Sequence, residues 1–213
     1  MRIACLVAAV LSVVMLFGRG KQTPLLPKAE TVAWIEESGG WVSHEIVQAS
    51  LRGTEVSDLS PLAKLTRLIR LDLSGTPASD LSPLANLTEL QWLYLLSTKI
   101  DDLTPLAKLT DLESLDDRDT LVADVSPLAR LEKLKELWLN NIKVSDISPL
   151  ANLPKLETLA VQGTQFTDVS RLAELKNLRE LWLSNQVTNE EVAKLKKALP
   201  KCAIYGYRIE PAR

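Results

Sequence analysis

Apolar residues recur at a regular spacing along the middle of the chain. In LIRLDLSGT, which begins at Leu68, the first, fourth and sixth residues are apolar, and polar residues alternate with the last two of them. Alternation with a period of two is typical of a short strand that buries one face. The pattern therefore predicts one strand in each copy. Further copies begin at Leu90 (LQWLYLLST), Leu112 (LESLDDRDT), Leu134 (LKELWLNNI) and Leu156 (LETLAVQGT).

A second phrase lies between these strands and returns every 22 residues. Its Ser-Pro or Thr-Pro pair, present in five of the six copies, predicts a hydroxyl N-cap followed by proline at the first helical position. One helical turn then faces its apolar residues to the core. An aspartate two residues before each pair can accept turn N–H groups, which we prefer to a ladder of metal ligands. The copies start at Leu59, Leu81, Leu103, Val125, Ile147 and Val169, and the aspartates are Asp58, Asp80, Asp102, Asp124, Asp146 and Asp168.

The combined unit, L-x-x-L-x-L-x-x-T-x-φ-x-D-φ-S-P-L-A-x-L-x-x with φ apolar, resembles the leucine-rich repeat. Its 22-residue form is similar to the repeats of bacterial internalins and of the regulatory subunit of protein phosphatase-1. The resemblance covers residues 46–187. It implies an α/β solenoid, a right-handed arc with a concave parallel β-sheet and short helical turns on the convex side, and it favours protein ligands.

Both ends of such a solenoid need closing elements, because an end repeat would otherwise expose its apolar face. Residues 27–38 predict a helix stopped by Gly39 and Gly40, and residues 41–54 predict a strand leading into the first repeat. After residue 187 we expect a second capping helix, with Thr188 or Asn189 as its cap, and a last strand. The predicted organisation is a signal peptide at 1–20, an N-terminal cap at 21–45, repeats at 46–187 and a C-terminal cap at 188–213.

The first 20 residues have the layout of a secretory signal peptide. Arg2 precedes an uncharged apolar run over residues 3–18, and Gly18-Arg19-Gly20 forms a small-x-small pattern. The run is shorter than the roughly 20 residues that span a bilayer, but glycine is a weak cleavage residue, so an uncleaved anchor is the alternative. We predict an exported bacterial protein of the periplasm, cell envelope or exterior, in contact with a membrane only through this segment.

The charge pattern argues against a nucleic-acid partner, and the cysteine count argues against an internal disulfide. The net charge is −2, and loss of Arg2 and Arg19 with the signal peptide gives −2 − 2 = −4. The two signs are interspersed without a basic run, which argues against nucleic acid. Cleavage would leave Cys202 as the single cysteine, so the mature fold cannot contain an internal disulfide and depends on its core. We expect a monomer.

Three residues in each predicted strand point away from the core, and they should stack into columns about 4.8 Å apart across the sheet. Three of the five tryptophans and one of the three tyrosines fall in these columns, beside several charged residues. Such aromatics can simply stabilise neighbouring strands, but exposed aromatics clustered with polar groups are typical of binding surfaces. The predicted partner-binding residues are Arg70, Asp72, Trp92, Tyr94, Asp116, Arg118, Glu136, Trp138, Glu180 and Trp182.

Catalytic chemistry is not indicated. His44 and Cys202 lie in opposite end caps, so they cannot form a nucleophile–base pair. The sequence has no phosphate-binding glycine loop, nucleophile elbow or Cys/His metal spacing, and an open sheet does not raise a carboxyl pKa as a closed cleft does. We expect a solvated or capping His44, a buried apolar role for Cys202, no cofactor and no enzyme activity.

Three functions remain. The first is a protein-binding module that uses the aromatics as anchors and the acids to select a basic partner. The second is a glycan-binding module in which the same aromatics stack on sugar rings. The third is a structural spacer. Family precedent and the mixed charges favour the first.

One repeat breaks the pattern, because Asp117 occupies the sixth position, which is apolar in the other copies. It should point inward between Leu95 and Leu139, where an unpaired carboxylate would cost several kcal/mol. Three explanations are open. The strand could be short or bulged, letting Asp117 turn to solvent or to turn N–H groups. Alternatively, Asp116, Arg118 and Asp119 could form an acidic recognition spot, or Asp116, Asp117 and Asp119 could bind Ca²⁺.

Overall fold

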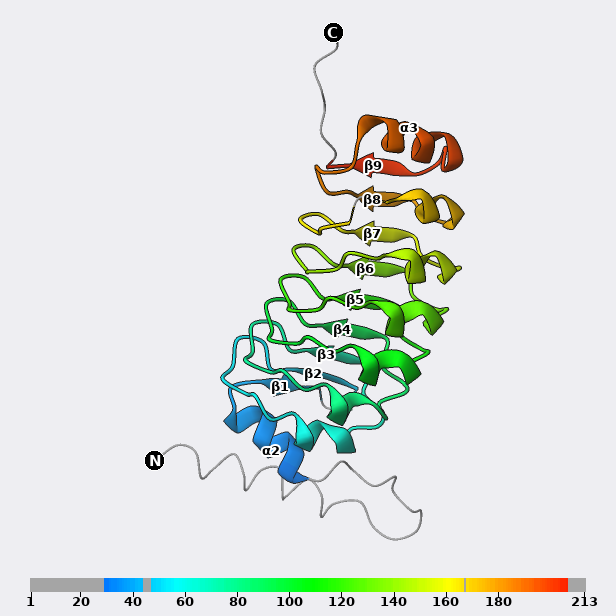
Figure 1. The fold of residues 1–213 in the computed structure, drawn as a ribbon. Coiled ribbons are helices and arrows are strands. Elements are labelled where there is room, and N and C mark those ends of the chain that lie inside the picture. The colour runs from blue at the N-terminus through cyan, green and yellow to red at the C-terminus, as the bar shows by residue number, and fades with distance from the viewer. Residues whose placement is uncertain (1–28, 44–46, 167, 207–213) are drawn as a thin grey trace, which may run out of the picture.

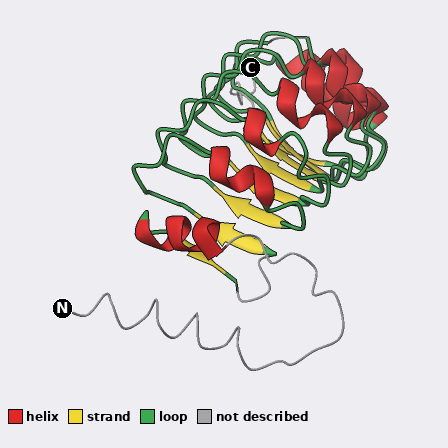
Figure 2. Ribbon diagram, turned by 90° about the horizontal axis from the view of Figure 1, so that it is seen from below, coloured by secondary structure: helices red, strands yellow, loops and turns green. Residues whose placement is uncertain are grey.

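The computed structural model describes residues 29–43, 47–166 and 168–206. Each 22-residue unit forms one coil, in which a strand is followed by a turn and a 3-10 helix (Figure 1). The strands stack along one side of the coil, and the short helices lie in a row along the other (Figure 2). This is the α/β solenoid that the repeat predicts, with its ends closed by helices.

The sheet of the described residues contains nine three-residue or two-residue strands in chain order. All neighbours are parallel except β1 and β2, which are antiparallel. Residues 41–54 therefore contain two strands instead of the one we expected. The strands are β1 (Trp41–Val42), β2 (Gln48–Ser50), β3 (Arg70–Asp72), β4 (Trp92–Tyr94), β5 (Ser114–Asp116), β6 (Glu136–Trp138), β7 (Thr158–Ala160), β8 (Glu180–Trp182) and β9 (Ala203–Tyr205).

The convex helices are short 3-10 turns whose start differs from the prediction. The helix N-cap is the apolar residue before Ser or Thr, and no side chain caps it. The predicted hydroxyl N-cap is therefore wrong. The helices are η1 (Ser60–Lys64), η2 (Ser82–Leu84), η3 (Thr104–Lys108), η4 (Ser126–Arg130), η5 (Ser148–Asn152) and η6 (Ser170–Glu174).

The recurring aspartate, and not the hydroxyl, accepts a backbone N–H at the start of each 3-10 helix. Asp58 Oδ1 accepts the Ser60 backbone N–H at 2.9 Å, and Asp102 Oδ1 accepts that of Thr104 at 2.7 Å. The same bond recurs in every described repeat. Hydrogen bonds from the side chain and then the backbone N–H of Ser60, Ser82 and Thr104 lower the pKa of Asp58, Asp80 and Asp102, because they favour the charged carboxylate. The predicted turn-capping role of this column is confirmed.

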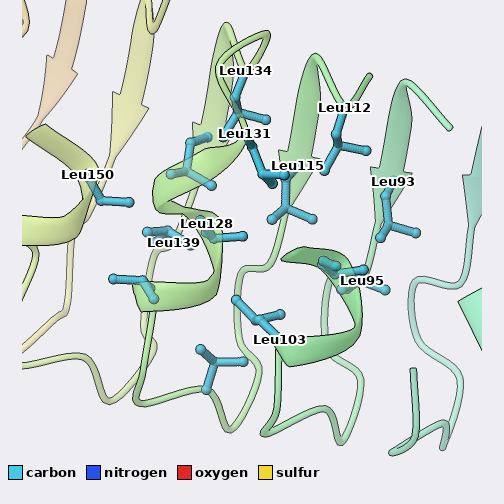
Figure 3. Packing of buried hydrophobic residues seen from close by; sticks show 14 of the residues in the cluster. Leu93, Leu95, Leu103, Leu112, Leu115, Leu128, Leu131, Leu134, Leu139 and Leu150 are labelled. Atoms are coloured by element: carbon cyan, nitrogen blue, oxygen red, sulfur yellow. The ribbon is translucent and has the colours of Figure 1, made fainter. Parts of the chain in front are cut away.

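Leucine side chains from strands and helical turns fill the interior as repeating layers (Figure 3). Leu93 and Leu115, the central residues of their strands, are fully buried, as are Leu106 and Leu128 from the convex turns. Each leucine side chain removed from water contributes about 1.5–3 kcal/mol. This core supplies the stability that a disulfide would otherwise provide.

Buried threonines form a second internal column near the strand ends. Thr98 Oγ1 donates to the Leu95 carbonyl at 2.8 Å, and Thr76 and Thr164 make the equivalent bond to the carbonyl three residues earlier. The Leu73 and Leu95 carbonyls also accept the backbone N–H of the same threonine, so the hydroxyl adds a second hydrogen bond that closes the turn. The threonine of the repeat is therefore a structural residue.

The ends are closed by two α-helices, α2 (Ala29–Glu37) beside β1 and α3 (Asn189–Ala198) beside β9 (Figure 1). Gly39 ends the first with φ of 85°, and a Cβ on Gly40 would collide with the Ser50 carbonyl, so the two-glycine stop is confirmed. Thr188 and Glu191 form a reciprocal capping box on α3. The signal peptide, His44 and residues 207–213 lie outside the described residues.

Candidate functional site

Strand pairing aligns the outward-facing residues into the predicted columns. The third-position column runs through Arg70, Trp92, Ser114 and Glu136, because each is the pairing partner of the next. The fifth-position column contains Asp72, Tyr94, Asp116 and Trp138 in the same register. We name this outward face of the sheet, from β1 to β9, the concave face.

Two aromatics that we did not predict extend the fifth-position column at both ends. Trp41 pairs with Ser50 and is 52% exposed, while its neighbour Val42 packs on the core. Tyr205 pairs with Trp182, is 41% exposed, and its ring stacks on that of Trp182 with centroids 4.3 Å apart. Both belong to strands outside the 22-residue register, so only the pairing of β1 and β9 could reveal them.

Arg70 forms the first of two arginine–aromatic clusters. Its Cζ lies 5.4 Å from the ring centroid of Trp92 and 5.5 Å from that of Tyr94. Its Nη2 also donates to the Tyr94 hydroxyl at 3.1 Å. Two cation–π contacts and one hydrogen bond orient the guanidinium on the concave face.

Arg118 forms the second cluster on β5 and β6. Its Nε and Nη2 donate to the two carboxylate oxygens of Asp116 at 2.8 and 2.7 Å, and its Cζ lies 5.7 Å from the Trp138 ring centroid. These hydrogen bonds raise the pKa of the Arg118 guanidinium. Asp116 is only 6% exposed, so its charge is already neutralised within the fold.

The remaining predicted acids differ in how far they are paired. Asp72 lies 3.7 Å from Arg52, which neutralises part of its charge. Glu136 is exposed and accepts a hydrogen bond from the Ser114 hydroxyl at 3.1 Å. Glu180 is exposed as well. The acids that face solvent freely therefore lie on β6 and β8.

Asp117 points into the core without any break in the sheet. The β5 register is regular on both sides, and the Asp117 backbone N–H donates to the Trp138 carbonyl at 2.9 Å. The side chain is 0% exposed, and neither carboxyl oxygen has a hydrogen-bond partner among the described residues. The inward orientation is confirmed, whereas the bulge that would turn Asp117 to solvent is wrong.

Burial raises the pKa of Asp117 well above its usual range, and the charge of Asp116 adds to the shift. Thr120 Oγ1 donates its single proton to the Asp117 backbone carbonyl at 3.0 Å, so it leaves the carboxyl unsatisfied. A neutral, protonated carboxyl is the form that this apolar layer tolerates.

The three carboxylates proposed for Ca²⁺ diverge. Asp116 is held by Arg118 on the concave face, Asp117 is in the core, and Asp119 accepts a hydrogen bond from Asn141 Nδ2 at 2.8 Å. No group of three potential metal ligands occurs in the part of the chain that the structure describes. The structure therefore does not bring together the three carboxylates that the calcium alternative requires. The acidic-spot alternative reduces to Arg118 and Asp119, because Asp116 is buried.

Cys202 is half-buried and packs against the hydrophobic core, in line with the apolar role that we expected for it. It lines a hollow of about 220 Å³ with Lys176, Lys201 and Ala198, the last residue of α3. Burial raises the pKa of its thiol to about 11, with Glu180 adding to the shift. The thiol is therefore protonated at neutral pH and is a poor nucleophile.

Along the chain that the structure describes, no helix is both long enough and apolar enough to cross a membrane. Nine of the ten predicted partner-binding residues lie on strands of the concave face, and the tenth, Arg118, lies two residues after β5. Six of them form the two arginine–aromatic clusters. The first cluster contains Arg70, Trp92 and Tyr94, and the second contains Asp116, Arg118 and Trp138.

Comparison with known proteins places the fold among solved solenoids. No protein-family model and no curated protein matches the sequence. A crystal structure of internalin C2 from Listeria monocytogenes is similar over 76% of this chain and 81% of that one, with a TM-score of 0.67 and 34% identity. Internalin F from the same bacterium is similar over 70% of this chain and 51% of that one, with a TM-score of 0.59 and 30% identity.

A plant peptide hormone receptor, solved in complex with its peptide RGF2, shares the fold at 16% identity and a TM-score of 0.63. The match covers 76% of this chain and 32% of the receptor. This chain therefore corresponds to most of internalin C2 but to about half or less of the two larger proteins.

Proposed function

This chain belongs to the leucine-rich repeat proteins of the internalin type, and from that premise we propose that it binds a protein partner through the concave face. Proteins of this kind serve as protein-interaction modules. The observation that carries the proposal is the set of six aromatic side chains spread along the sheet on β1, β4, β6, β8 and β9, at Trp41, Trp92, Tyr94, Trp138, Trp182 and Tyr205.

The arrangement of these side chains favours recognition over mere support of the strands. Aromatics that only stabilised the sheet would need no guanidinium beside them. Arg70 and Arg118 are instead fixed over ring faces by hydrogen bonds, which lowers the entropy that an ordered interface must lose on binding. Tryptophan, tyrosine and arginine are also the residues that most often anchor interfaces.

The same arrangement weakens the glycan alternative. A sugar ring stacks on an open aromatic face, but Arg70 lies near the rings of Trp92 and Tyr94, and Arg118 lies over Trp138. Binding that survives moderate salt and is competed by a simple sugar would favour glycan, whereas loss of binding at moderate salt favours a charged protein partner.

The proposal is tested by replacing Trp92, Trp138 and Trp182 together with alanine. The wild type should recover a protein from envelope extracts that the triple variant does not recover. The matched control replaces Lys64, Lys108 and Arg130, which are exposed on the convex helices. Circular dichroism melting must show that both variants fold. If the tryptophan variant recovers every partner of the wild type, the concave face is not the binding surface.

We further propose that the protein works outside the cytoplasm as a non-enzymatic monomer. The likeness to internalins supports export, and the high pKa of Cys202 supports the absence of thiol chemistry. Mass spectrometry of the protein recovered from its producing cell would show whether the mature chain starts at Lys21 or keeps residues 1–20. Light scattering after size exclusion would give the oligomeric state.

A further inference from the structure

The third-position column of the concave face carries opposite charges toward its two ends. Arg70 lies on β3, whereas Glu136 and Glu180 lie on β6 and β8. None of the ion pairs among the described residues includes any of the three. The other charged residues of the face are paired, Arg118 with Asp116 at 2.7 Å and, more weakly, Arg52 with Asp72 at 3.7 Å.

The surroundings of Arg70 leave its guanidinium able to bind an acidic group. The rings of Trp92 and Tyr94 hold its guanidinium, and its one described side-chain hydrogen bond goes to the Tyr94 hydroxyl, an uncharged partner. A guanidinium offers five N–H donors in a planar fork that matches a carboxylate. Most of this donor capacity is therefore unused but already oriented.

The spacing of the column sets the dimensions of a matching ligand. Three strand steps separate Arg70 from Glu136 and five separate it from Glu180, or about 14 and 24 Å at about 4.8 Å per step. An extended polypeptide advances about 3.3 Å per residue, so it covers these distances in about four and seven residues.

We propose that the partner contributes an extended polypeptide segment that lies along this column, with an acidic side chain on Arg70 and basic side chains on Glu136 and Glu180. This inference rests on the proposed function, since it assigns the chemistry of the ligand for the same face. The sequence alone indicated a basic partner, whereas this inference specifies a segment that carries both an acidic and a basic side chain at a set spacing. A sulfated glycan would satisfy Arg70 but would meet repulsion at the two glutamates.

The test is a selection from a random dodecapeptide display library on the full-length protein and four variants. The variants are Arg70→Gln, the double variant Glu136→Gln/Glu180→Gln, Arg52→Gln as a control for an arginine already paired, and the triple tryptophan-to-alanine variant. Peptides enriched on the wild type should carry an acid and a base about four or seven residues apart. Arg70→Gln should lose the acid but keep the base, and the double glutamine variant should do the reverse.

The strongest wild-type peptide is then synthesised for calorimetry. Arg70→Gln should weaken its binding at least tenfold, Arg70→Lys should recover only part of it, and Arg52→Gln should bind as the wild type does. Enriched peptides without the charge spacing, or an acid that persists on Arg70→Gln, would overturn this inference while leaving the binding face intact. No enrichment above the tryptophan variant would also overturn this inference, whereas the proposed function is decided separately by the recovery of partners from envelope extracts.

Discussion

Arg118 donates two hydrogen bonds of 2.8 and 2.7 Å to the Asp116 carboxylate, while its guanidinium lies over the Trp138 ring. The carboxylate that the sequence offered as a free recognition acid is thus an internal partner that positions an arginine. The free charge of the concave face is consequently set by residues that lack such a partner.

Replacing Asp116 with asparagine should lower the free energy of unfolding by about 1 kcal/mol, because it removes a bidentate ion pair whose arginine can regain some hydration. Urea unfolding of Asp116→Asn, Arg118→Gln and the double variant would measure the coupling between the two side chains. Purely additive effects would mean that the pair contributes nothing to stability.

Replacing Asp117 with leucine should stabilise the protein by about 2 kcal/mol or more. The change removes a buried carboxyl with no hydrogen-bond partner and adds apolar surface between the leucine layers of the neighbouring repeats. Urea unfolding measures the gain. Asp117→Asn is the control, because it keeps an unpaired polar group there and should bring no comparable gain. A leucine variant less stable than the wild type would show that the carboxyl has a partner in solution.

The buried Asp117 also predicts a pH dependence of opposite sign to that of most acids. Its folded pKa lies above its unfolded value of about 3.9, so between the two the folded state keeps a proton that the unfolded state has lost. The stability contributed by this protonation is complete below about pH 4 and is lost as the pH rises toward the folded pKa. The difference in unfolding free energy between Asp117→Leu and the wild type should therefore grow from pH 4 to pH 7.

The turn aspartates predict how the stability of the fold decreases at acid pH. Hydrogen bonds from Ser82 and Thr104 lower the pKa of Asp80 and Asp102, and Asp58, Asp146 and Asp168 are lowered by equivalent bonds. Stability from these bonds is present above about pH 4 and is lost as the pH falls through the folded pKa values. Asparagine at Asp80 and Asp102 together should flatten the fall in melting temperature between pH 4 and pH 2.5. An unchanged acid limb would contradict the capping role.

The repeat made the fold and the columns predictable, because a period of 22 residues places equivalent residues on equivalent strands. Side-chain pairing was not predictable, since the sequence does not show that Arg118 turns back to Asp116 two residues away. Trp41 was missed because β1 runs antiparallel, outside the repeat. The sequence placed Asp117 inward but left open a bulge that would turn it to solvent; parallel pairing on both sides of β5 holds the backbone in register and leaves its side chain no route outward.

The turn after each strand predicts a stabilising glycine substitution. The eighth position of every complete described repeat has a positive φ, which Gly53, Gly75 and Gly163 adopt without strain but Ser97, Asp119 and Asn141 adopt at a steric cost. Ser97 is exposed and has φ of 58°, so Ser97→Gly should raise the free energy of unfolding by about 0.5–1 kcal/mol. Gly53→Ala is the converse control, because a Cβ there would touch nothing and only its φ of 68° opposes alanine. Gly53→Ala should lower the free energy of unfolding by about as much as Ser97→Gly raises it, as measured by urea unfolding. Equal stability of both variants and the wild type would mean that the turns relax to other backbone angles in solution.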